Sequence, residues 1–193
     1  MKIVRFPLYF LGVALLTGAA VLALKFFGFE IVMKENGVVE WLEVLWLLLS
    51  SLFLFLAARR SIEYSGLFSV LWLLPVIAAI RELDGIFDKI FHGAWIIPAM
   101  FIAAIVFYRI FRSFNILKLQ SLSFINTQQV VFLGVGFFIV VIFAQISGEQ
   151  CVMRAVLQEH YHRYVGRFVE EFIEFLGYII LVIGSLECYI QTT

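Results

Sequence analysis

The sequence is poor in several residue types, and each shortage narrows the class of protein. Only 15% of the 193 residues are charged, against about 25% in soluble domains, and 14 basic and 14 acidic side chains leave no net charge. Without a basic stripe there is no reason to expect nucleic acid as a partner. The two cysteines, Cys151 and Cys188, lie outside any CxxC motif, so neither a zinc–thiolate site nor a redox dithiol is predicted.

Apolar residues are abundant instead, at 63% of the chain with 22 phenylalanines and a mean hydropathy of +1.03. A helix that crosses a bilayer needs about 20 mostly apolar residues. The segments of that length predict an all-α, polytopic membrane protein, a bundle of about six transmembrane helices in one domain (1–193): 6–29, 38–58, 66–86, 93–111, 129–148 and 168–190. The first segment is too long and too poorly ended for a cleaved signal peptide.

Local signals add detail to this bundle. Pro75 and Pro98 fall inside the third and fourth segments and predict kinks there, because proline lacks the N–H that a helix interior needs. The stretch 113–129 alternates polar and apolar residues and predicts a short amphipathic piece along the membrane interface. Glycines within the segments predict close contacts between helices: Gly12, Gly18, Gly134, Gly136, Gly177 and Gly184.

Alternating crossings gather the acids on one face of the membrane. All of the 14 except Glu63 and Glu187 fall on the face with the loops near 30–37, 85–92 and 149–167. The 14 bases divide equally between the two faces, so the positive-inside rule alone gives a tie. We expect the N- and C-termini in the cytoplasm, because the bases on their face have few acids nearby. The expected location is the bacterial inner membrane, with the lipid bilayer as a partner.

Several of these acids lie at helix ends, where they can converge. Glu40 and Glu43 begin the second segment three residues apart, so both face one groove. Acids also favour helix starts through the helix dipole, which is the alternative explanation for Glu40. Glu149 follows the fifth segment at the same depth. The sequence therefore predicts an acidic pocket at the mouth of the bundle.

The end of the third segment carries a polar stripe. Arg81, Asp84, Asp88 and His92 follow at i, i+3, i+7 and i+11 and share one face if the helix continues. Glu82 lies off that stripe, within reach of a neighbouring helix. The alternative interpretation is a structural network of ion pairs.

The start of the sixth segment offers a second polar face, with His160, Tyr164, Arg167, Glu171 and Glu174 at helical spacing. Histidine together with carboxylates from several helices is typical of a divalent-metal site, for zinc, manganese, iron or magnesium. The candidates for catalysis are Glu43, Glu82, Asp84 and Glu174. The candidates for ligand binding are Glu40, Arg81, Glu149, Arg167 and Glu171, and those for metal binding are Asp88, His92 and His160.

The run Glu35-Asn-Gly-Val-Val-Glu40-Trp-Leu-Glu43 resembles the start of the second helix in a group of small, uncharacterised bacterial membrane proteins. Those proteins carry DG-x-x-EWLT there and an acidic motif near a later helix end. The resemblance covers about the second and third segments, and Glu43 stands where the group has threonine. It implies a bacterial multi-pass membrane protein and implies no activity.

Three hypotheses follow. The first is a pocket at the non-cytoplasmic face that binds or hydrolyses a small polar or lipid-headgroup ligand, with a divalent cation that lets the carboxylates lie close together. The second is a non-catalytic subunit or sensor of a larger complex, with a membrane-protein partner or a second copy of the chain. The third, transport of cations or protons, is disfavoured because the first, fourth and fifth segments have no ionisable residue at mid-depth.

Overall fold

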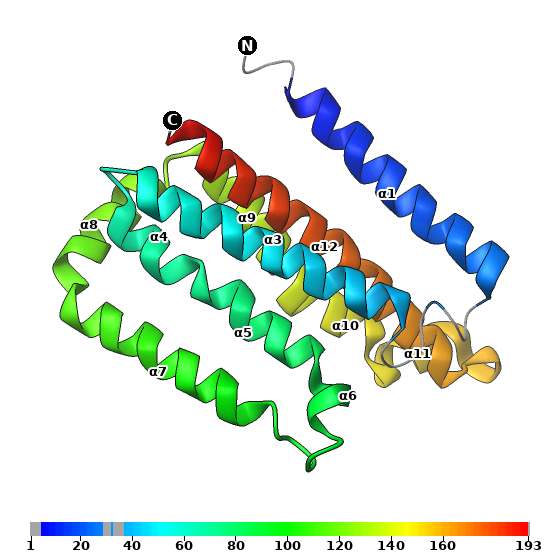
Figure 1. The fold of residues 1–193 in the computed structure, drawn as a ribbon. Helices are drawn as coiled ribbons and strands as arrows, with labels where there is room; N and C mark the ends of the chain where they lie inside the picture. The colour runs from blue at the N-terminus through cyan, green and yellow to red at the C-terminus, as the bar shows by residue number, and fades with distance from the viewer. Residues whose placement is uncertain (1–4, 29–31, 33–36, 193) are drawn as a thin grey trace.

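The computed structural model describes residues 5–28, 32 and 37–192, and these are helical with short connections and contain no strand. Figure 1 shows the arrangement of the helices. In chain order they are α1 (Arg5–Phe27), α3 (Val38–Arg60), α4 (Ser65–Leu71), α5 (Leu73–Glu82), α6 (Asp84–Phe87), α7 (Ile96–Arg112), α8 (Phe114–Phe124), α9 (Gln128–Phe138), the π-helix η2 (Ile139–Ala144), α10 (Gln145–Gly148), α11 (Gln150–Leu157), the 3-10 helix η3 (Gln158–His160) and α12 (Arg163–Gln191).

Within the described residues, five helical stretches are long and apolar enough to cross a membrane: α1, α3, α4 with α5, α9 through α10, and α12. Helices α7 and α8 form a pair bent by 93°, which brings the number to six if the pair is one span. The 17 residues of α7 rise about 25 Å, somewhat less than the ~30 Å hydrocarbon core. The prediction of an all-α polytopic bundle is confirmed.

The long helix α12 is the central element, and it contacts both α3 and the α9–η2 stretch (Figure 1). Tyr178 of α12 is buried in one core cluster with Leu47 of α3, Ala79 of α5 and Val140 of η2. Nearer the C-terminus, Cys188 is buried with Phe68 and other apolar side chains. The fold therefore fixes α3, α5 and α12 against one another at the depth of Tyr178.

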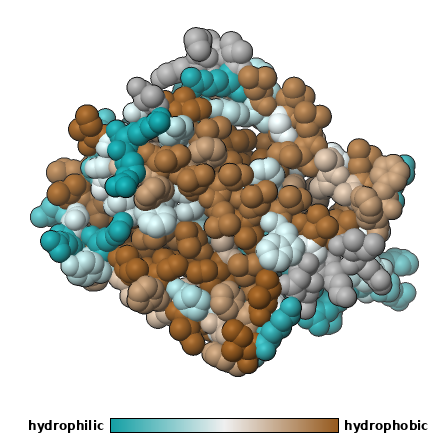
Figure 2. All heavy atoms as spheres, in the orientation of Figure 1, coloured by the Kyte–Doolittle hydropathy of each residue, from teal (hydrophilic) through white to brown (hydrophobic). Residues whose placement is uncertain are grey.

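Helix α3 has a buried face that carries polar as well as apolar side chains and an exposed face that is apolar. Its buried stripe includes Glu43, Leu47 and Ser50, at the spacing of three to four residues that marks one helix face. Its opposite face exposes leucines, with Leu45 at 46% and Leu48 at 49%. Figure 2 shows hydrophobic residues over most of the face that it presents. Such an exterior suits lipid, which is as apolar as the leucines that face it.

Helix α1 lies apart from the other helices (Figure 1), and Ala20 is its one buried residue among those described. Ala20 packs against Val39 of α3 and Phe175 of α12. At the other end of α1, the Tyr9 hydroxyl donates a hydrogen bond to Glu187 of α12. Helix α1 is therefore joined to the bundle by a narrow strip of contacts.

The predicted kinks and the interfacial stretch have different outcomes. Pro75 is the third residue of α5, and the helix breaks just before it, because proline has no N–H to donate to the carbonyl of Leu71. Pro98 lies in the first turn of α7, where no such donor is needed, so the predicted kink is wrong there. The stretch 113–129 contains α8, which turns sharply from α7 as an interfacial piece would.

The predicted glycine contacts divide into two groups. A Cβ on Gly136, Gly177 or Gly184 would lie within 3.0 Å of a neighbouring helix, so these glycines permit close approach. The prediction is wrong for Gly12, Gly18 and Gly134, where no described atom comes within 4 Å. The tightest of the three contacts joins Gly177 of α12 to Val140 of η2, at 2.5 Å from the added Cβ.

We therefore expect Gly177→Ala to destabilise the bundle by about 1–3 kcal/mol, the usual effect of overpacking. Gly134→Ala is the matched control in the neighbouring helix, and it should leave stability unchanged or raise it slightly, because alanine favours helices. Thermal unfolding of the two detergent-solubilised variants measures the difference. Equal midpoints would show that α9 and α12 are not held as closely as the structure places them.

Candidate functional site

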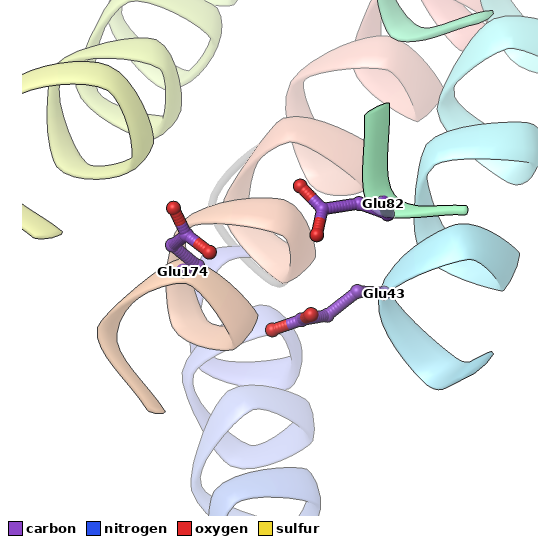
Figure 3. A group of neighbouring side chains, drawn as sticks. All are labelled: Glu43, Glu82 and Glu174. Atoms are coloured by element: carbon purple, nitrogen blue, oxygen red, sulfur yellow. The ribbon is translucent and has the colours of Figure 1, made fainter. Parts of the chain in front are cut away.

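Three glutamates from three helices converge at one end of the bundle. They are Glu43 of α3, Glu82 of α5 and Glu174 of α12, and each has a carboxylate oxygen within 4.8 Å of one from each of the others. Figure 3 shows the three side chains pointing toward one another. Glu43 is 0% exposed and Glu174 5%, while Glu82 is partly buried. We call this group the glutamate cluster.

Local sequence explains the convergence. Glu43 lies on the buried stripe of α3, one turn after Val39 and one turn before Leu47. Glu174 lies one turn before Tyr178, on the buried face of α12. Glu82 is the last residue of α5, one turn after the buried Ala79. All three carboxylates are therefore carried on faces that pack inward.

Glu82 and Glu174 have hydrogen-bond donors. The Tyr178 hydroxyl donates to Glu82 Oε1 at 2.6 Å. The Gln145 side-chain amide donates to Oε1 of both Glu174 and Glu170 at 2.9 Å. The Arg81 guanidinium lies 4.0 Å from Glu174 Oε1. That distance is at the limit of an ion pair, and Arg81 is half-exposed.

Glu43 is different, because both of its carboxylate oxygens are buried and neither has a hydrogen-bond partner among the described residues. An isolated ionised carboxylate in an apolar interior costs several kcal/mol even after the surroundings relax. Two further carboxylates nearby add repulsion. A bound cation removes both penalties, and protonation is the other way to relieve them.

A polar cleft of ≈ 470 Å³ lies over the glutamate cluster, formed where α3, α5, α10 and α12 end or begin. Arg167 donates to Glu40 at 3.1 Å and to Glu171 at 3.0 Å, and these pairs form part of the cleft wall. Asp84 and Glu149 are exposed and lie at the rim. The residues lining the cleft are Glu40, Arg81, Glu82, Asp84, Gln145, Gly148, Glu149, Gln150, Tyr161, Arg163, Arg167, Glu170, Glu171 and Glu174.

The structure thus brings together most of the residues predicted for catalysis and ligand binding. Glu40, Arg81, Glu149, Arg167 and Glu171 all line the cleft. Of the residues predicted for catalysis, Glu82, Asp84 and Glu174 line it too. Glu43 lies beneath it, in the glutamate cluster.

The residues predicted for metal binding lie elsewhere, which corrects that part of the expectation. Helix α5 ends at Glu82, so Asp88 and His92 no longer continue its polar stripe. They meet each other at an exposed turn, with His92 Nδ1 2.8 Å from Asp88 Oδ2. His160 is exposed in η3. None of the three lines the cleft described above.

The turn at Asp88 has a structural role. The Gly93 N–H donates to Asp88 Oδ1 at 2.8 Å. This hydrogen bond, and then the one with His92, lowers the pKa of Asp88 below its ordinary value. The ionised Asp88 carboxylate therefore stabilises the folded protein above the ordinary pKa of an aspartate. That stabilisation is lost as the pH falls through the lowered pKa of Asp88. Asp88 therefore closes the connection between α6 and α7.

Sequence reasoning missed Gln145 as a site residue. Gln145 follows the π-helix η2, whose wider turn changes the direction in which the next residues point. That change brings the amide to Glu170 and Glu174. The available signal was a single glutamine after a long apolar run.

A second polar group lies at the opposite end of α12, where Glu187 is 6% exposed. Besides Tyr9, it accepts a hydrogen bond from Gln191 at 2.8 Å, and it lies 3.8 Å from the Arg5 guanidinium. These contacts fasten the start of α1 to the end of α12. They agree with the expectation that Glu187 lies on the face opposite the acidic pocket.

The chain matches no protein-family model, no curated protein and no solved structure. The functional assignment therefore rests on the geometry of the glutamate cluster and the cleft.

Proposed function

We propose that this multi-pass membrane protein binds a divalent cation at the glutamate cluster and uses it to hold, or to hydrolyse, a small polar or lipid-headgroup ligand in the cleft. The observation that carries the proposal is Glu43. Its carboxylate is fully buried, has no hydrogen-bond partner among the described residues and faces two other carboxylates. A divalent cation is the ligand whose charge and coordination satisfy all three at once.

The chemistry of the ligand atoms restricts the identity of the metal ion. The glutamate cluster offers only carboxylate oxygens, since the three candidate residues Asp88, His92 and His160 lie elsewhere. Magnesium, manganese and calcium prefer oxygen ligands at about 2.0–2.6 Å, whereas zinc and iron sites commonly include nitrogen or sulfur. Oxygens within 4.8 Å of one another fit a common cation at such distances. We therefore favour manganese, magnesium or calcium.

The cleft explains what such a cation does. Glu82 and Glu174 both line the cleft floor, so a cation held by them is reached from the cleft by a ligand oxygen or a water molecule. If the reaction is hydrolytic, the cation polarises that water and one carboxylate acts as the general base. Arg81, also in the cleft wall, is placed to contact an anionic part of the ligand, and Arg167 holds the wall together through Glu40 and Glu171.

Transport fits the same structure less well. Buried polar side chains do continue along α12, since Ser185 is hydrogen-bonded to Ser50 at 2.5 Å. Yet Tyr178 and Ser185 are about 10 Å apart along the helix, with Leu181 on the same face between them. A path for cations or protons needs polar groups or water in that interval, so the geometry favours binding.

Metal analysis of the purified protein tests the proposal. We expect about one manganese ion per chain after equilibration with Mn²⁺ and removal of the excess, because a buried site releases its ion slowly. Glu43→Gln should lose the ion, and Glu149→Gln, at the exposed rim, is the matched control that should keep it. Wild-type protein without bound Mn²⁺, Mg²⁺ or Ca²⁺ would refute the proposal.

We also propose that the cleft faces away from the cytoplasm in the bacterial inner membrane. Cys151, near the cleft, is exposed, whereas Cys188 is buried and cannot report on the other side. Ile62, at the end of α3 remote from the cleft, is 98% exposed and can carry a cysteine in a Cys151→Ser background. A membrane-impermeant maleimide should label Cys151 in intact cells and label Ile62→Cys only after permeabilisation. The reverse pattern would invert the orientation.

A further inference from the structure

A second hollow lies beside α12, on the side of α1. It encloses ≈ 320 Å³ and is lined by Leu24 of α1 and by Tyr164, Val165 and Phe168 in the first two turns of α12. Its walls are apolar apart from the tyrosine hydroxyl. Because α1 and α12 are both long and apolar enough to cross a membrane, a hollow between them opens toward lipid.

The hollow and the polar cleft are neighbours around the surface of α12. Successive residues of a helix are rotated by about 100°, so Arg167, Tyr164 and Phe168 follow one another around it in that order. Arg167 lines the cleft, whereas Tyr164 and Phe168 line the hollow. A single ligand with a polar and an apolar part can therefore contact both.

The depth of the hollow suits the junction of a lipid's headgroup with its acyl chains. Helix α12 has 29 residues, which rise about 43 Å, close to the 40–45 Å of a bilayer with its headgroup layers. The first turns of α12 then lie in one headgroup layer. The hollow is located there, and in the next turns of α12 Phe172 and Phe175 pack in a core cluster with Ala20 of α1.

The loose attachment of α1 gives a lipid access. Helices in a membrane associate through close packing of small residues. Gly12 and Gly18 of α1 have no described atom within 4 Å of an added Cβ, so they make no such contact. Helices α1 and α12 meet through apolar side chains around Ala20 and Phe175 instead, and the hollow beside Leu24 adjoins that contact.

We propose that the ligand is a membrane phospholipid, with its phosphate-bearing headgroup in the cleft and an acyl chain in the hollow between α1 and α12. The assignment rests on the proposed function, since the cation at the glutamate cluster supplies part of the positive charge that faces the phosphate. Arg81 and Arg163 of the cleft wall supply the rest, while Arg167 is paired with Glu40 and Glu171. A soluble phosphate ester has no acyl chain to occupy the hollow.

Binding of phosphatidylglycerol to the Mn²⁺-loaded protein in detergent, counted by native mass spectrometry, tests the assignment. Leu24→Trp fills the hollow from α1. Leu22→Trp is the matched control, because it places the same ring where the wild-type side chain is 55% exposed. We expect Leu24→Trp to weaken phosphatidylglycerol binding about tenfold, the effect of excluding two methylenes, and Leu22→Trp to leave it unchanged. If Leu24→Trp fails to fold, Val165→Phe fills the hollow from α12 and replaces it.

Mn²⁺ binding, measured in the same samples, distinguishes failure of the lipid assignment from failure of the proposed cation site. Unchanged phosphatidylglycerol binding in the filled variant overturns the lipid assignment and leaves the cation site standing. Binding of glycerol 3-phosphate as tight as that of the lipid has the same meaning, because the acyl chain then contributes nothing. Wild-type protein that binds no Mn²⁺ overturns the proposed function itself, whatever the lipid does.

Discussion

Replacing Glu43 and Glu174 together by glutamine is expected to reduce the affinity for Mn²⁺ by at least about 100-fold. Loss of a residue that only hydrogen-bonds to a metal ligand typically reduces affinity by about 10–100-fold, and here two ligands themselves are removed. Both carboxylates are buried and directed at the same point as Glu82. Glutamine keeps the shape of each side chain and removes the charge that a cation needs. The reduction should appear in isothermal titration of the detergent-solubilised protein.

The control for this titration is the pair Asp84→Asn with Glu149→Gln. Both residues are exposed acids at the rim of the same cleft, so this pair removes the same number of charges and leaves the glutamate cluster intact. Its effect on affinity should stay within about threefold, as expected for screened surface charges. Affinity in the wild-type protein should also fall with acidification, because protons compete with the metal for the carboxylates. Equal losses in the two pairs would assign the binding to diffuse negative charge.

We expect Glu43→Leu to be more stable than the wild-type protein in EDTA and less stable in saturating Mn²⁺. In EDTA the wild-type chain buries three carboxylates close together, and Glu43 has no hydrogen-bond partner within the described part of the chain. Leucine of similar volume removes that charge, and such replacements raise stability by up to about 1–4 kcal/mol. The variant should therefore unfold several degrees above the wild-type protein in EDTA.

Saturating Mn²⁺ should reverse the order. A ligand present at about 100 times its dissociation constant stabilises the folded state by about 2.7 kcal/mol. Only the wild-type protein retains all three carboxylates, so its unfolding midpoint should rise and that of Glu43→Leu should not. Unfolding followed with and without EDTA measures both shifts. A Glu43→Leu variant that is less stable in both conditions would show that the carboxylate has a structural partner.

The membrane-spanning helices were predictable because their signal is local. A run such as Val38–Arg60 is apolar along most of its length, and no distant residue is needed to identify it as a span. The packing of α1 was not predictable in the same way. Its 23 residues are as apolar as those of α3, yet only Ala20 is buried among the residues described. Hydropathy measures solubility in lipid and does not distinguish a helix at the edge from one in the core.

The convergence of acids was also partly predictable, because Glu43 and Glu174 lie near the starts of two predicted segments and Glu82 near the end of a third, all on the same face of the membrane. Which acids are buried depends on the three-dimensional packing. Glu82 and Asp84 are two residues apart, yet Glu82 joins the cluster and Asp84 lies exposed at the rim. The difference arises because α5 ends at Glu82, so the chain changes direction before Asp84.

The histidine candidates show the limit of extrapolating a helical pattern. The spacing from Arg81 to His92 has meaning only while one helix continues, and the turn at Leu83 ends it. Gln145 reaches the site although spacing did not predict it, because the π-helix before it changes the direction in which its side chain points. In both cases the deciding feature is a local break in the helix that hydropathy and spacing do not reveal.

The most direct test of the cation site is an anomalous-scattering map of the protein crystallised with Mn²⁺. A bound cation gives a peak between Glu43, Glu82 and Glu174, at about 2.0–2.4 Å from an oxygen of each. The contrary result is a map without a peak at the glutamate cluster, in which the Glu43 carboxyl is hydrogen-bonded to a neighbouring carboxylate. Glu43 would then be held as a neutral acid, and the cluster would be a structural contact between helices.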